Sequence, residues 1–100
     1  MDVDYELYKK VINKLEENKP KTIKDPEIIK RVLIACRLLI EKDDTIPVIA
    51  EKLGTSDFTI YRDLTCRLAR LNKIAPEVID KNMVDAVNAT LEKHRLANLY

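Results

Sequence analysis

The stretch "VIAEKLGTSDFTIYRDLTCRL", Val48 to Leu68, has the pattern of two short helices joined by a tight turn. Ala50 is small enough for a second helix to pack closely on the first, and Gly54 can adopt the left-handed conformation that ends a helix. Ser56 is a good N-cap for the second helix, because its hydroxyl can accept a hydrogen bond from a backbone N–H in the first turn. This spacing predicts a helix-turn-helix over residues 45–71.

The composition of the whole chain favours an all-α fold. The 100 residues are 46% hydrophobic and 35% charged, which is typical of a single globular domain, here residues 1–100. There is a single Gly and only four Pro, so little turn chemistry is available for β-hairpins. Apolar residues recur every three or four positions, as in amphipathic helices. We therefore expect a compact bundle of about five helices that contains the helix-turn-helix and has no β-wing.

The other helices of this bundle can be placed from their own signals. An extra N-terminal helix is expected over 3–18, where apolar residues recur every four positions. The segment "DPE" at Asp25 predicts the start of a second helix, apolar over most of its circumference, that continues to about Lys42. The helix-turn-helix itself is expected to use helices over 46–53 and about 56–71. Pro76 is the expected start of the last helix, which continues to near Leu96.

The helix over 56–71 is the candidate recognition helix. One face carries the apolar residues Ile60, Leu64 and Leu68 and should face the core. In a recognition helix, the N-terminal half of the outer face reaches base edges. The candidate DNA-binding residues are therefore Ser56, Asp57, Phe58, Thr59, Tyr61, Arg62 and Thr65.

The outer residues could play distinct parts. Arg62 could contact guanine through two hydrogen bonds and Phe58 a thymine methyl group, while Ser56, Thr59 and Tyr61 could bind phosphates. Two of these residues also have another interpretation. Arg62 could be a solvated surface charge, and Phe58 could contact another protein.

Other polar residues are expected to have structural or solvated roles. The i, i+4 pair of Asp63 and Arg67 is expected to stabilise the helix rather than to bind DNA. The acidic pair Asp43 and Asp44 should be solvated, and His94 should lie at the surface near a helix end. No spacing of nucleophile, base or metal ligand points to catalysis, so neither an enzyme nor a metal or cofactor site is expected.

The remaining sequence features concern compartment and partners. The N-terminus lacks a secretory signal, and no apolar run reaches the length of about eighteen residues that a membrane span needs. A cytoplasmic, nucleoid-associated protein with free thiols at Cys36 and Cys66 is therefore expected. The net charge of +1 indicates that any nucleic-acid site is local.

The segment "TIPVIAEKLGTSDFTIYRDLTCRL", from Thr45, resembles the helix-turn-helix of the stage III sporulation protein D family. The resemblance covers roughly residues 28–95 and is densest in the middle third, where "VIA", the "G-x-S" turn and "T-I-x-R-DL-T-x-RL" follow that family's pattern. It implies a bacterial transcriptional regulator that binds double-stranded DNA.

Departures from the family pattern concern charge. Pro47 and Asp57 stand where the family tends to have basic residues, and its basic C-terminal extension has no counterpart after "HRLANLY". DNA binding should then be weak, or strengthened by a homodimer formed through the N-terminal or the second helix. The alternative is a helical protein–protein interaction module on the same fold.

Overall fold

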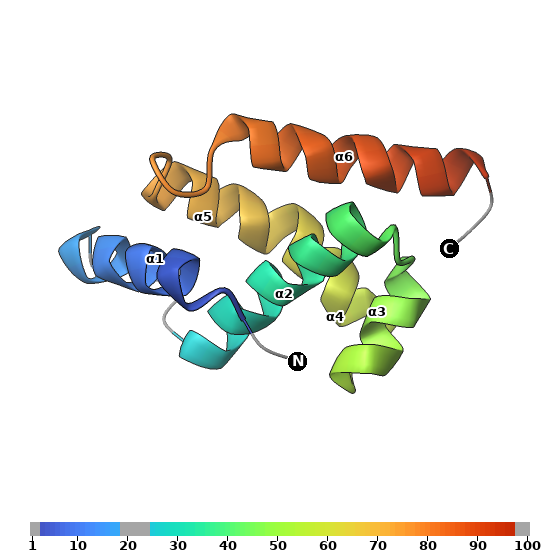
Figure 1. The fold of residues 1–100 in the computed structure, drawn as a ribbon, viewed down its shortest axis with the longest axis horizontal. Helices are drawn as coiled ribbons and strands as arrows, with labels where there is room; N and C mark the ends of the chain where they lie inside the picture. The colour runs from blue at the N-terminus through green and yellow to red at the C-terminus, as the bar shows by residue number, and fades with distance from the viewer. Residues whose placement is uncertain (1–2, 19–24, 98–100) are drawn as a thin grey trace.

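The computed structural model describes residues 3–18 and 25–97, and within these ranges the regular structure is entirely helical, as expected (Figure 1). Three segments, α4, the π-helical turn η1 and α5, follow one another without a break and form one long helix, so the described residues form five helices. The elements are α1 (Tyr5–Asn18), α2 (Pro26–Lys42), α3 (Ile46–Leu53), α4 (Asp57–Arg62), η1 (Asp63–Arg67), α5 (Leu68–Ile74) and α6 (Lys81–Leu96).

Helix α2 lies at the centre and contacts α1, α3, η1 and α6 (Figure 1). Its start follows the predicted signals: Asp25 accepts a hydrogen bond from the backbone N–H of Glu27 at 2.9 Å, and Pro26 is the first residue of the helix. Apolar residues around most of its circumference are buried, namely Ile29, Val32, Leu33, Ala35, Cys36, Leu38 and Leu39. Ile40, in the same apolar segment, is 42% exposed.

The last helix begins later than predicted. Pro76 does not start it, because the chain first makes a turn in which the backbone N–H groups of Val78 and Ile79 both donate to the carbonyl oxygen of Ala75. Asp80 is the N-cap of α6, and its carboxylate accepts from the N–H of Met83 at 3.0 Å. A proline is favourable in a first turn, but it offers no acceptor to the free N–H groups there, whereas the carboxylate of Asp80 does.

The other helix limits differ by a few residues from the predicted ones. The first helix begins at Tyr5 rather than Val3, and the long helix continues past Leu71 to Ile74. The side chain of Asn72 donates to the carbonyl oxygen of Ile79 at 2.7 Å, which ties the end of the long helix to the following turn.

His94 is buried, contrary to the prediction of a surface position. Its side chain is 3% exposed, and its Nε2 lies 2.9 Å from the Oδ1 of Asp43, the residue that follows α2 in a left-handed conformation. The same oxygen accepts from Lys93 at 2.7 Å. These two contacts hold the pKa of Asp43 below its usual value, and the contact with Lys93 has the larger effect. Nor is Asp44 simply solvated, because it is paired with Lys52 at 2.6 Å. The acidic pair therefore anchors α6 and α3 to the end of α2.

Candidate nucleic-acid interface

The turn between α3 and α4 is organised by Gly54. Gly54 adopts the expected left-handed conformation, with φ 67° and ψ 38°. The N–H of the next residue, Thr55, donates to the carbonyl oxygen of Ala50 at 3.0 Å and so closes the end of α3. An added Cβ at Gly54 would meet nothing within 4 Å, so the requirement for glycine comes from the backbone conformation and not from crowding.

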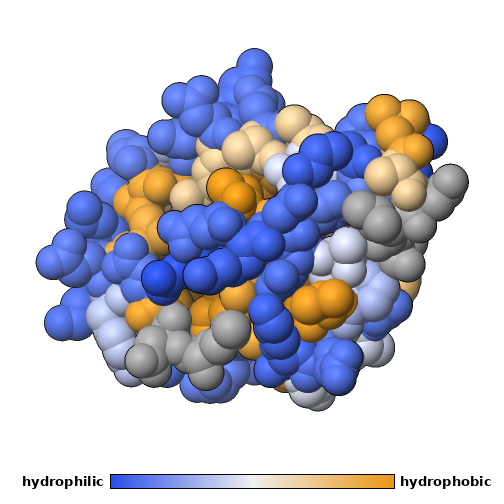
Figure 2. Space-filling view, turned by 45° about the vertical axis from the view of Figure 1, so that its right-hand side comes forward, coloured by the Kyte–Doolittle hydropathy of each residue, from blue (hydrophilic) through white to orange (hydrophobic). Residues whose placement is uncertain are grey.

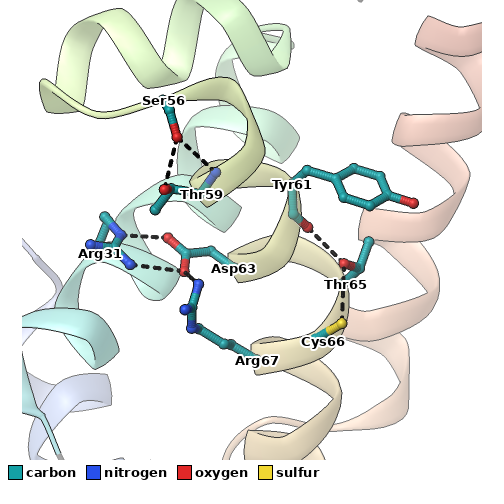
Figure 3. A network of polar contacts seen from close by, with 8 residues as sticks. All are labelled: Arg31, Ser56, Thr59, Tyr61, Asp63, Thr65, Cys66 and Arg67. Carbon is teal, nitrogen blue, oxygen red and sulfur yellow. Dashed lines mark hydrogen bonds and ion pairs between the residues drawn. The ribbon is translucent and has the colours of Figure 1, made fainter.

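The first turn of α4 is capped by Ser56. Its Oγ accepts from the backbone N–H of Thr59 at 3.2 Å and lies 2.9 Å from the Thr59 hydroxyl (Figure 3). Both hydroxyl groups therefore take part in a local network that defines where the helix begins. Ser56 remains exposed and Thr59 half-buried at the same end of the helix.

The inner face of the long helix packs as the sequence predicts. Ile60, Leu64 and Leu68 are at most 1% exposed, and Ala50 of α3, which packs with α4, is 2% exposed. This packing fixes the orientation of the long helix. Its outward face is determined as a consequence.

The outward face of α4 carries two exposed aromatic residues and one arginine. Phe58 is 67% exposed and Tyr61 50% exposed, and the guanidinium carbon of Arg62 lies 5.7 Å from the centre of the Phe58 ring. Asp57, in the first turn, is also exposed. A shallow, mainly apolar groove runs beside these residues and is also lined by Ile46 and Pro47 at the start of α3.

The seventh predicted site residue, Thr65, is less available. It is half-buried, and its hydroxyl donates to the carbonyl oxygen of Tyr61 at 2.7 Å, one turn back in the same helix (Figure 3). Its Oγ1 also lies 3.9 Å from the sulfur of Cys66, which is exposed. The structure thus brings the predicted residues to one end of the helix, with Thr65 a turn further along and tied to the helix backbone.

Asp63 is the residue whose role the sequence showed only in part. The predicted pair with Arg67 is present at 2.7 Å, but Asp63 is fully buried and also accepts two hydrogen bonds from Arg31 of α2, at 2.6 and 3.1 Å (Figure 3). The bond to Asp63 raises the pKa of Arg31. Arg31 lies 32 residues earlier in the sequence, so no local pattern could have identified it.

The helix widens to π geometry at this buried carboxylate. In η1, the backbone N–H of Leu68 bonds to the carbonyl oxygen of Asp63, five residues back, instead of the usual four. The wider turn includes Asp63 and Leu64, both buried, and Arg67, which is mostly covered. The outward residues of α4 therefore stand on a helix that is attached to α2 at this turn.

The outer surface of the molecule is mixed in character. Figure 2 shows hydrophilic side chains over most of one face, with separate hydrophobic patches between them. Across the described residues, no helix combines the length and apolarity of a membrane span. Nor do the described parts of the chain bring together three or more residues of the metal-binding types His, Cys, Asp and Glu.

Comparisons with known proteins assign the family. Searches of curated proteins and of solved structures gave no match. The family model described as stage III sporulation protein D matches residues 24–96, which include all helices from α2 to α6. Because this match covers most of the chain, the protein belongs to the stage III sporulation protein D family, a family of DNA-binding regulators of sporulation and not of enzymes.

Proposed function

We propose that this protein is a sequence-specific DNA-binding transcriptional regulator that uses α3 and α4 as a helix-turn-helix. In this proposal the long helix, residues 57–74, is the recognition helix and enters the major groove through α4. The observation that carries it is the outward-facing group of Phe58, Tyr61 and Arg62 in the first turns of a helix whose inner face is buried. A rigid helix with exposed side chains at its N-terminal end is what groove recognition requires.

The side chains of this end divide into two roles. Arg62 offers planar paired donors for a guanine, and Phe58 an apolar face for a thymine methyl group. Ser56, Thr59 and Tyr61 carry hydroxyls near the helix start, where phosphate contacts position the protein without reading sequence. Thr65 would act at the margin, since its hydroxyl already bonds to its own helix.

Asp57 opposes this binding and limits the affinity. It is an exposed carboxylate in the first turn of α4, where a phosphate would approach. A homodimer would compensate by doubling the contact area. A groove between α1 and α2, lined by Leu7, Ile34 and the exposed Ile40, supports one or both of these helices as the dimer contact.

The second candidate function is a protein-interaction module. It is favoured by the exposed Phe58 and Tyr61 and by the apolar groove that they share with Ile46 and Pro47. Such exposed apolar clusters often mark protein contacts. Only the DNA-binding function predicts that added positive charge on this face tightens binding to duplex DNA.

A binding titration against random-sequence duplex DNA, at about 50 and about 200 mM salt, tests the proposal. Asp57→Lys should tighten binding and steepen its salt dependence, since a repulsive charge becomes one that releases counterions. Arg62→Ala should weaken binding by about 1 to 3 kcal/mol, if its contact is a paired one to guanine.

Matched controls on α6 separate a local effect from a change of net charge. Asp85→Lys changes the charge as Asp57→Lys does, and Lys81→Ala as Arg62→Ala does, both at exposed positions. These controls should leave binding nearly unchanged. Absence of salt-dependent binding by the wild type and by Asp57→Lys would reject the DNA proposal, and loss of a protein complex on Phe58→Ala would then support the alternative.

A further inference from the structure

Phe58 and Arg62 form a contacting pair on the outer face of α4. They are one helical turn apart, and the guanidinium carbon of Arg62 lies 5.7 Å from the Phe58 ring centre, within the range of a cation–π contact. The ring is 67% exposed, and Arg62 is exposed as well. The pair is therefore preorganised and still accessible from outside.

Arg62 differs from the neighbouring arginines in what holds it. Arg31 and Arg67 are both engaged by the buried carboxylate of Asp63, whereas within the described residues Arg62 has an aromatic ring and no carboxylate as partner. An aromatic ring engages the face of a guanidinium and leaves its N–H edges free. Those edges are the part that bonds to the O6 and N7 of guanine.

The spacing of the pair suits two bases that lie one or two steps apart. The ring centre and the guanidinium carbon are 5.7 Å apart, a distance between one and two base-pair steps of about 3.4 Å each. With the guanidinium against the ring, the two groups meet the groove floor side by side. The chemistry that matches the ring there is the C5-methyl of thymine, because no other standard base presents an apolar group in the major groove.

We propose that Phe58 and Arg62 act as one specificity-determining unit that reads a G·C pair and a T·A pair one or two steps apart. This inference rests on the proposed function of α4 as the recognition helix. Arg62 supplies the guanine contact, and Phe58 both contacts the thymine methyl and holds the guanidinium in place. Recognition of the thymine and of the guanine is therefore coupled, and a substitution at Phe58 also weakens the preference for guanine.

Selection of preferred sites from random duplexes with the wild-type protein provides the first test. The selected sites should contain a thymine one or two positions from a guanine. Replacement of that thymine by uracil removes only the methyl group and should weaken wild-type binding about fourfold, the effect of burying one such group. The same replacement at a thymine outside the selected positions is the control and should have no effect.

Variants of Phe58 and Arg62 then test which base each residue recognises. With Phe58→Ala the uracil and thymine duplexes should bind equally, and with Phe58→Leu, which stays apolar but loses its ring, the thymine preference should remain while the guanine preference relaxes. Arg62→Lys should keep the salt dependence but lose most of the preference for guanine, since an ammonium cannot make the paired contact. Both positions are exposed, and circular dichroism verifies that each variant folds.

The outcomes distinguish this inference from the function on which it rests. Wild-type protein that shows no salt-dependent binding to any duplex would overturn the proposed function, and this inference with it. Salt-dependent, sequence-selective binding in which the uracil penalty is absent, or is as large in Phe58→Ala as in the wild type, would overturn the paired reading alone.

Discussion

Asp63→Asn removes the negative charge that two arginines share, and its effect on stability can be worked out from the structure. The carboxylate is fully buried, with Arg31 and Arg67 within 2.7 Å. Removing one partner of a fully buried ion pair costs about 3 to 5 kcal/mol, because the remaining charge loses its compensation. The arginine side chains here are 26% and 22% exposed, so water relieves part of this cost. We expect a loss of about 2 to 4 kcal/mol, a large fraction of the typical 5 to 15 kcal/mol of a folded domain.

Urea denaturation followed by far-ultraviolet circular dichroism measures this loss. Glu41→Gln is a suitable control, because its pair with Arg37 is exposed on both sides and should contribute less than about 1 kcal/mol. Arg67→Ala should cost less than Asp63→Asn, since it leaves the carboxylate paired with Arg31. A free energy of unfolding for Asp63→Asn within about 0.5 kcal/mol of the wild type would refute the reasoning that this carboxylate holds the long helix against α2.

Further predictions concern the turn, the thiols and acid stability. Gly54→Val should destabilise the protein by roughly 1 kcal/mol or more, since its φ of 67° is strained for a β-branched residue, and the same denaturation experiment measures it. Ala50→Leu should cost about 1 to 3 kcal/mol by overpacking the contact of α3 with α4, and an unchanged midpoint would show that the site has spare room. Cys36 should react slowly with a thiol reagent and Cys66 rapidly, as time-resolved labelling with mass spectrometry would reveal, and the reverse order would contradict the burial. Because burial raises the pKa of Cys36 from 9.0 to about 12, its thiol contributes stability that is intact below pH 9.0 and declines as the pH rises toward about 12. Lys93 and His94 lower the pKa of Asp43 below 3.8, so the stability that its carboxylate contributes is present above pH 3.8 and is lost as the pH falls through the pKa of the folded state. Asp43→Asn should therefore remove part of the acid-induced loss of stability. An acid denaturation profile identical to that of the wild type would contradict this.

Much of the candidate site follows from local sequence signals. The left-handed turn at Gly54, the cap at Ser56 and the buried face of Ile60 and Leu64 were all predicted and are present. Each depends on residues within about one turn of the chain, such as a hydroxyl reaching a nearby N–H, and such interactions depend little on the rest of the fold. The outward position of Phe58 follows as well, because it lies on the face opposite the apolar stripe.

Other features depended on contacts beyond a single helical turn. Asp80, and not Pro76, starts α6, and the turn that precedes it accepts a hydrogen bond from the side chain of Asn72, seven residues before Ile79. The Phe58–Arg62 contact is local. Whether Arg62 is available to bind a ligand, however, depends on which arginines are paired with Asp63. That competition is decided only when α2 packs beside the long helix.

The sequence by itself determined the all-helical fold, the caps at Asp25 and Ser56, the turn at Gly54 and the buried face of the long helix, because these follow from the helical period and from hydrogen bonds within a turn. Only the tertiary structure decided which polar side chains are buried. Asp63 receives its second arginine from 32 residues away, and His94 meets Asp43 across 51 residues. Burying a charged or polar group costs free energy unless a partner compensates it, and whether that partner is present depends on how distant helices pack.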